Sequence, residues 1–289
     1  WGHSETSGID TIDYFVSSKY FEIEQPQSQY SEKLYLMNSL STYYYPPTKI
    51  LLPSNHVFQK RSEYGLNDRM NVYGCIQSSF KISEEFEKIL DGIIRGDPNG
   101  VILMSTNKPF CKSQVKRMVK LMGEQNFRRL LFYPSLNNLS YMNLIRLTDV
   151  ILDPYPFGGC NSSLEAFSMD KIVITHESNM INGRFTAGFY KKMGLDDLIC
   201  KNKKEYVKKA TELTNLNNKN NTNNDYYKLV TDRDVEKTIL GRVNSDFNIN
   251  YGKNTELFIK LMELSKRIQV KYLEEFIPNE KIGYMGTKA

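Results

Sequence analysis

The sequence predicts an α/β protein with a doubly wound parallel sheet. Between Asn71 and Thr175, short apolar runs alternate with amphipathic stretches, and this alternation is typical of βαβ units. The chain has 289 residues, of which 40% are hydrophobic and 25% are charged, so it is long enough for one large or two modest globular domains. Because such sheets bind ligands at the carboxyl ends of their strands, functional residues are expected directly after the strands.

The predicted elements follow from the positions of the apolar runs. Residues 12–18 are predicted to form a strand that ends in a polar loop, and residues 25–66, with scattered Pro and repeated Tyr, to form loops and a linker. Further strands are predicted at 72–74, 101–104, 129–133, 150–152 and 171–175, which is the last clear strand. Helices are predicted at 84–95, 112–122 and 140–147, and another begins near Leu164.

The C-terminal third has a different character. Residues 215–224 are rich in Asn and lack apolar anchors, which predicts a disordered surface insertion. Residues 256–276 carry apolar residues at helical spacing, and Pro278 marks the end of the long helix that they predict.

Composition excludes several classes of function. The net charge of +5 is mild, and we expect no nucleic-acid partner because such binders concentrate basic residues on one face. The four cysteines are widely spaced, and none of the three histidines lies at metal-ligand spacing from another, so we expect no disulfide framework, no metal and no cofactor. No apolar run reaches about 18 residues. We therefore expect no membrane span, and a reducing, cytoplasmic compartment is the simplest interpretation.

The most informative stretch runs from Asp153 to Glu165, between a predicted strand and a predicted helix. The amino end of a helix attracts anions through its backbone N–H groups and its dipole. Gly158 and Gly159 let the backbone approach a ligand closely. Polar and thiol side chains follow the two glycines, namely Cys160, Asn161, Ser162 and Ser163. Glu165, one turn into the helix, can accept hydrogen bonds from ribose hydroxyls, so the stretch predicts a site for a nucleoside diphosphate with an attached sugar. A polar loop that only caps the helix through Ser162 is the structural alternative.

This stretch resembles the donor-binding loop of the O-GlcNAc transferase/SPINDLY family, which are cytosolic inverting glycosyltransferases of GT-B fold. The acid Glu165 is closer to the SPINDLY form, whereas Cys160-Asn161-Ser162 stands where animal members have His-Thr-Thr. Two further blocks are similar to the family. Residues 2–34 resemble the segment that closes its N-terminal catalytic domain, and residues 73–82 resemble the block that opens its C-terminal catalytic domain.

The resemblance implies roles for further residues. Lys81 falls at the position of the family's pyrophosphate lysine, and Gln77 lies one residue out of register with a glutamine that contacts phosphate. Leu136 and Asn138 lie where members read the base edge, and Tyr141 lies where animal members place a histidine over the base. His3 is a candidate general base. For Arg184 a salt bridge is favoured over a phosphate contact, and for Asp153 a structural role in the loop is favoured over catalysis.

The resemblance also implies the architecture and the function. Residues 1–66 would be the end of an N-terminal catalytic domain plus a linker, residues 67–250 a Rossmann-like donor-binding domain, and residues 251–289 a helix that returns to pack near residues 12–16. The expected activity is inverting, metal-independent transfer of a sugar from a UDP- or GDP-sugar to a Ser or Thr hydroxyl of a protein or peptide. Two alternatives stay open, namely a non-catalytic nucleotide-binding module and an Asn-directed glucosyltransferase of the same lineage.

Overall fold

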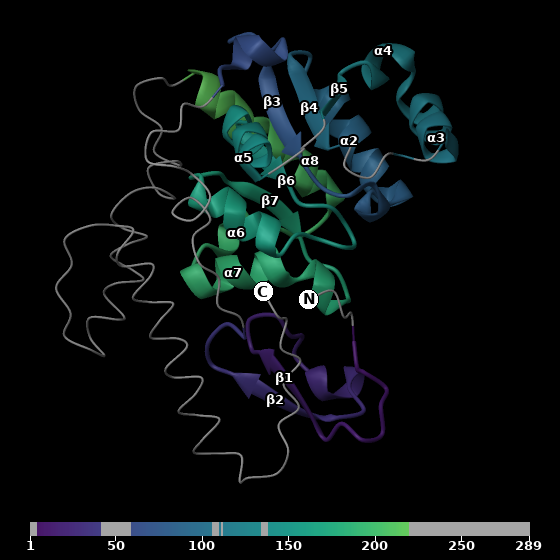
Figure 1. Cartoon of the computed structure of the whole chain (residues 1–289), viewed down its shortest axis with the longest axis vertical. Coiled ribbons are helices and arrows are strands. Elements are labelled where there is room, and N and C mark those ends of the chain that lie inside the picture. The colour runs from purple at the N-terminus through teal and green to yellow at the C-terminus, as the bar shows by residue number, and fades with distance from the viewer. Residues whose placement is uncertain (1–4, 42–58, 106–109, 111, 134–137, 220–289) are drawn as a thin grey trace, which may run out of the picture.

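In a computed structural model, the chain folds around one large parallel sheet with a small N-terminal unit beside it (Figure 1). The structure describes residues 5–41, 59–105, 110, 112–133 and 138–219. The predicted helix over 256–276 and residues 220–224 of the Asn-rich stretch lie outside the described residues.

The large sheet has six parallel strands in the order β5-β4-β3-β6-β7-β8. Its strands are apolar and mostly buried on both faces, as parallel sheets covered by helices require. Their bounds are β3 Asn71–Cys75, β4 Gly100–Ser105, β5 Leu130–Tyr133, β6 Val150–Leu152, β7 Val173–His176 and β8 Ile199–Cys200. The prediction of a doubly wound parallel sheet is therefore confirmed.

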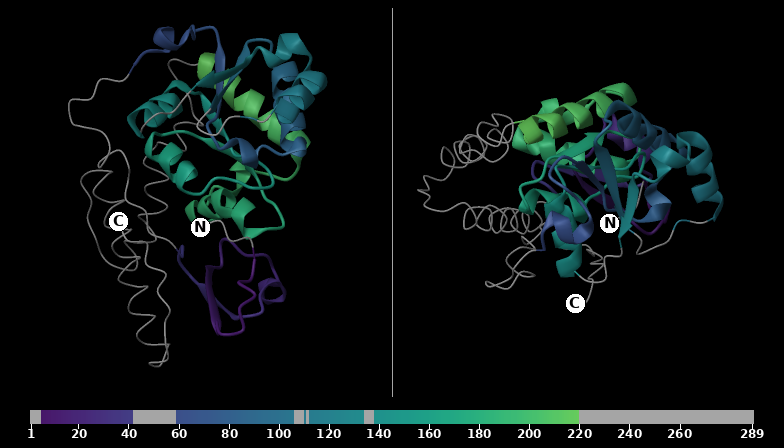
Figure 2. Two further views of the ribbon diagram at one scale, coloured as in Figure 1. Left: turned by 45° about the vertical axis from the view of Figure 1, so that its right-hand side comes forward. Right: turned by 90° about the horizontal axis from the view of Figure 1, so that it is seen from above.

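Helices cover both faces of this sheet (Figures 1 and 2). The helices α2 and α8 pack against each other on one face, and α5 and α6 lie on the other. The bounds are α2 Glu84–Gly96, α3 Lys112–Met122, α4 Glu124–Phe127, α5 Asn138–Leu147, α6 Asn161–Ser168, α7 Phe185–Met193 and α8 Lys203–Lys219. Short 3₁₀ turns are η1 Pro26–Gln29, η2 Arg61–Tyr64, η3 Ser79–Lys81, η4 Ile181–Gly183 and η5 Asp196–Leu198.

The strand order creates a switch point between β3 and β6. From β3 to β5 the chain adds strands on one side of β3, and it then crosses back to place β6 on the other side. The connections that leave β3 and β6 therefore diverge to opposite faces of the sheet. A crevice at the carboxyl ends of two such strands is the usual ligand site of open α/β sheets.

The N-terminal unit, residues 5–41, contains a strand that the sequence interpretation missed. Its strands β1 (Tyr14–Ser18) and β2 (Lys33–Met37) are parallel, with Tyr14 opposite Lys33. Residues 33–37 were expected to be loop, and that expectation is wrong. A five-residue strand whose partner lies almost twenty residues earlier has little local pattern, because its pairing is decided by tertiary contacts.

Two other boundaries differ from expectation. The strand β8 has only two residues, too few for a periodic pattern, and it adds an edge after the expected last strand. The Asn-rich stretch was expected to leave the fold at residue 215, but α8 continues to Lys219. Asn215 is held there because its side-chain oxygen accepts a hydrogen bond of 3.0 Å from Asn71 Nδ2 at the start of β3.

None of the described helices is long and apolar enough to cross a membrane.

Candidate functional site

The switch point brings together two segments that are about eighty residues apart in sequence. The chain that leaves β3 carries Gln77 and ends in η3 with Lys81, while the chain that leaves β6 forms the loop 153–160 before α6, here called the β6–α6 loop. Lys81 Nζ donates to the Gly158 carbonyl oxygen at 2.8 Å, and Gln77 Nε2 donates to Ser162 Oγ at 2.6 Å. The structure thus unites the two predicted groups of site residues.

Lys81 is a half-buried cation with a well-defined position. Its ammonium group also donates to Gln77 Oε1 at 3.2 Å and lies 4.5 Å from the centre of the Phe157 ring, within the range of a cation–π contact. Burial lowers the pKa of Lys81, and the nearby Asp153 carboxylate opposes that shift. The packing against Phe157 could not be predicted from the sequence, because the local pattern around a loop aromatic residue does not specify which distant side chain packs on its ring.

Asp153 is buried at the centre of the β6–α6 loop. Its carboxylate accepts hydrogen bonds from the Gly159 backbone N–H and from Thr175 Oγ1 at 2.8 Å. Burial raises the pKa of Asp153, while these hydrogen bonds and Lys81 act to lower it. The carboxylate therefore organises the loop from inside the protein, which agrees with the structural role that the sequence favoured for it.

The two glycines are needed for internal packing. A Cβ atom on Gly158 would lie 2.9 Å from Asp153 Oδ2, and one on Gly159 would lie 2.6 Å from the hydroxyl oxygens of both Ser162 and Ser163. Their backbone N–H groups donate inward, to Asn182 O at 3.1 Å and to Asp153. Close approach of a ligand was the expected reason for glycine here, whereas the structure adds close approach of the loop's own side chains.

The amino end of α6 faces this assembly. Cys160 occupies the N-cap position without a side-chain hydrogen bond to the helix, so Ser162, which lies inside the helix, is not its N-cap residue. Burial raises the pKa of the Cys160 thiol. Asn161 is exposed, Glu165 lies partly exposed one turn further on, and Ser163 is buried against Thr186 with 2.7 Å between their hydroxyl oxygens. The first N–H groups of a helix have no intrahelical acceptors, so this end can receive an anion.

The remaining predicted residues lie elsewhere. Asn138 is the exposed first residue of α5, and Tyr141 is half-buried against the main core on the same helix. Their roles at a nucleobase stay predictions. His3 and Leu136 lie outside the described residues. Arg184 forms the expected salt bridge, to Glu22 at 3.2 Å.

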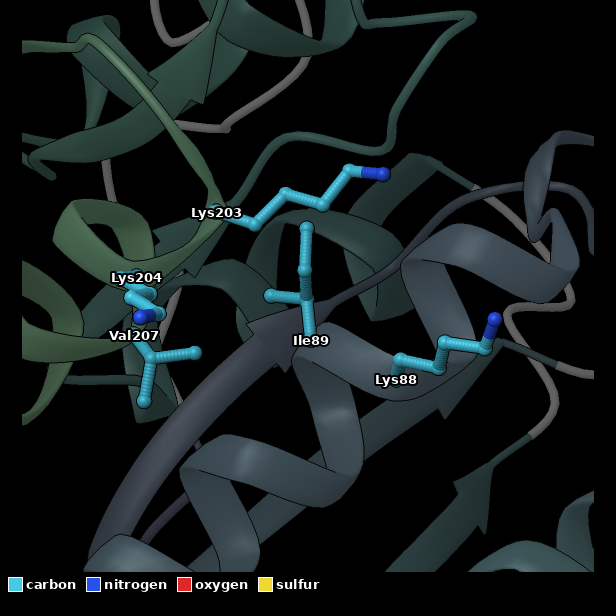
Figure 3. Close-up of a pocket in the computed structure, with 5 residues that line it drawn as sticks. All are labelled: Lys88, Ile89, Lys203, Lys204 and Val207. Atoms are coloured by element: carbon cyan, nitrogen blue, oxygen red, sulfur yellow. The ribbon is translucent and has the colours of Figure 1, made fainter.

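A separate shallow pocket of about 340 Å³ lies between α2 and α8 (Figure 3). Lysine stems and two aliphatic side chains line it, namely Lys88, Lys203, Lys204, Ile89 and Val207. Lys203 is paired with Glu85 at 3.0 Å. This pocket contains none of the predicted site residues, so the switch-point assembly is the better candidate site. Within the described ranges, no group of three His, Cys, Asp or Glu side chains could hold a metal ion.

Fold and site together define a Rossmann-like module with the amino end of a helix at its switch point. The family model of glycosyl transferase family 41 matches residues 47–235. The chain therefore belongs to glycosyl transferase family 41, as its resemblance to the O-GlcNAc transferase/SPINDLY family implied.

Individual relatives support the same family. The chain is similar to proteins described as probable UDP-N-acetylglucosamine–peptide N-acetylglucosaminyltransferase SPINDLY. It is 24% identical over 219 residues to the one from Solanum lycopersicum and 22% identical over 218 residues to the one from Arabidopsis thaliana. Each match covers 74% of this chain but 23% of the relative, so the chain spans about a quarter of their length.

A solved structure shares the fold. The K341M mutant of Thermobaculum terrenum O-GlcNAc transferase superposes with a TM-score of 0.64 at 18% identity, covering 95% of this chain and 48% of that one. The expected GT-B-type fold is thereby confirmed.

Proposed function

We propose that this chain forms the donor-binding part of an inverting, metal-independent glycosyltransferase. It would move a sugar from a UDP- or GDP-sugar to a Ser or Thr hydroxyl of a protein. The observation that carries the proposal is the convergence of Lys81 with the amino end of α6 at the switch point of the sheet.

The chemistry of sugar transfer needs what this convergence provides. Negative charge grows on the diphosphate as the bond to the sugar breaks, and preorganised donors stabilise that charge. An ammonium group has three N–H donors, and Lys81 directs two of them to Gly158 and Gln77 in the described part of the chain. The third donor and the N–H groups of α6 supply the contacts to phosphate in this proposal, and Glu165 holds the ribose.

The acceptor and the compartment are proposed on other grounds. The relatives' names describe transfer to a peptide, and we extend that acceptor class to this chain. A reducing, cytoplasmic compartment is supported by the free thiols of the described cysteines, which are Cys75, Cys160 and Cys200.

Calorimetric titration of the 289-residue chain with UDP and with GDP tests the proposal. We expect one of them to bind with a Kd between micromolar and millimolar values, with no change on adding EDTA. Loss of affinity with EDTA would refute the metal-free scheme, and the absence of binding by either nucleotide would refute the donor site. Release of nucleotide from UDP- or GDP-sugars separates an enzyme from a non-catalytic module, which would bind without turnover.

A further inference from the structure

Arg184 is a buried cation with an unusual set of partners. Its side chain is 3% exposed and lies between the N-terminal unit and the start of α7. Its guanidinium group donates to the Phe21 carbonyl oxygen at 2.6 Å, to Glu22 Oε2 at 3.2 Å and to Gln29 Oε1 at 3.3 Å, all three in the N-terminal unit. It also donates to Asn179 O at 2.5 Å. Most of the compensation for this buried charge therefore comes from residues 5–41.

The segment around Arg184, residues 178–186, also packs against the β6–α6 loop. Asn182 O accepts a hydrogen bond of 3.1 Å from the Gly158 N–H. A Cβ atom on Gly183 would lie 2.0 Å from Pro156 O, so only glycine allows this close approach of backbone to backbone. At the other end of the segment, Thr186 pairs with the buried Ser163 of α6. The segment that holds the N-terminal unit thus also holds the loop.

An apolar cluster makes a second connection between the same parts. Phe21 of the N-terminal unit is fully buried and meets the rings of Phe185 and Phe189 edge to face, at 5.0 and 5.6 Å between centroids. Cys160 and Leu164, at the start of α6, pack against this cluster. Figures 1 and 2 show the N-terminal unit beside α7, the helix that carries Phe185 and Phe189.

The energetic consequence follows from the burial of the charge. A buried guanidinium that loses its partners is strongly unfavourable, so the surrounding backbone rearranges to give it new ones. Here the backbone that would rearrange is the 178–186 segment, which carries the acceptor for Gly158 and the glycine packed on Pro156.

We infer that Arg184 is a positioning residue that couples docking of the N-terminal unit to the geometry of the β6–α6 loop. The nucleotide affinity of the loop then depends on the N-terminal unit, although Arg184 itself touches no ligand. This dependence rests on the proposed function, whereas the coupling rests on the contacts alone.

Two substitutions test the coupling. Arg184→Lys keeps the charge but loses the forked donor geometry, and Glu22→Gln keeps the shape but weakens the charge pairing. The control is Arg61→Lys. Arg61, in η2, likewise connects a segment outside the large sheet to residues next to β6. It pairs with Asp149 at 2.6 Å and donates to Leu147 O at 3.0 Å, and neither partner lies in the β6–α6 loop. For each variant we would measure hydrogen exchange in residues 154–165, the Kd for UDP and GDP, and the melting temperature.

We expect Arg184→Lys and Glu22→Gln to speed exchange in residues 154–165 and to raise the Kd by about 2- to 30-fold, the range of coupling through packed networks. Arg61→Lys should lower the melting temperature but change neither the exchange in residues 154–165 nor the Kd. Loop exchange equal to that of the control at a matched loss of melting temperature would overturn the inference. If Arg184→Lys fails to fold, the milder Glu22→Gln carries the test. If the wild type binds neither nucleotide, the proposed function fails, and exchange alone still decides the coupling.

Discussion

Replacing Lys81 with Ala is the most direct test of how this site would hold a diphosphate. In the structure, Lys81 Nζ already donates to the backbone carbonyl oxygen of Gly158 at 2.8 Å and to the side-chain oxygen Oε1 of Gln77 at 3.2 Å. One N–H donor is therefore assigned to the ligand, and the substitution removes one charge-assisted contact. Such a contact is worth about 1.5–3 kcal/mol, which corresponds to a roughly 10- to 150-fold rise in Kd at about 1.4 kcal/mol per factor of ten.

A second variant separates charge from packing. The Lys81 ammonium group lies over Phe157 at 4.5 Å, so Ala removes packing as well as charge. Lys81→Met keeps an unbranched apolar stem there and lacks only the charged group. If the charge dominates, both variants should lose affinity to a similar degree. If the loop instead collapses without its packing, the Kd of Lys81→Ala should rise much more than that of Lys81→Met.

The assay is calorimetric titration with UDP and GDP, together with thermal melts of the unliganded variants. Lys120→Ala, on the exposed side of α3, is the control for removal of a positive charge. It should leave the Kd within about twofold, since exposed charges at a distance are screened. A Kd for Lys81→Ala that equals the Lys120→Ala value would refute the assignment of Lys81 to phosphate.

Three further predictions concern the loop and its surroundings. Glu165→Ala should weaken binding of UDP and GDP but leave inorganic pyrophosphate unaffected, because only the nucleotides carry a ribose; an equal loss for all ligands in thermal-shift titrations would contradict this. Gly159→Ala should cost about 1–3 kcal/mol by overpacking, because its Cβ would lie 2.6 Å from two hydroxyl oxygens. Gly96→Ala, at the end of α2 and with its nearest contact at 3.7 Å, is the control in the same denaturant titration and should stabilise the protein by roughly 0.4–1 kcal/mol, because Ala restricts the unfolded chain. Burial raises the pKa of Glu32, but hydrogen bonds from Ser7 and Thr6 outweigh it and bring this pKa from 4.5 to about 2. Because the folded-state pKa is depressed, Glu32 stabilises the protein above pH 4.5 and that stability is lost as pH falls towards 2. Glu32→Gln should flatten the stability curve in this window, and an unchanged slope there would show that other groups dominate.

Much of the fold could be predicted from local pattern. The apolar runs at 72–74, 101–104 and 150–152 all lie in strands of the sheet, and the amphipathic stretch at 112–122 coincides with α3. These elements are buried on both faces or along one stripe, and such burial produces apolar runs or apolar residues at helical spacing in the sequence. By contrast, β2 and β8 are short and paired at a distance, so their patterns were too weak to find.

The candidate site divides in the same way. The sequence by itself determined the composition of the β6–α6 loop and the presence of Lys81 after a strand, because both are runs of a few residues with a recognisable spacing. Only the tertiary structure decided that Lys81 meets Gly158, that Asp153 shapes the loop from within, and that Arg184 binds Glu22 across 162 positions of the chain. A one-dimensional pattern records which side chains are polar or apolar at each turn of the backbone. It does not record which distant group a buried polar atom must find to be satisfied, because that partner is selected by the packing of the whole domain.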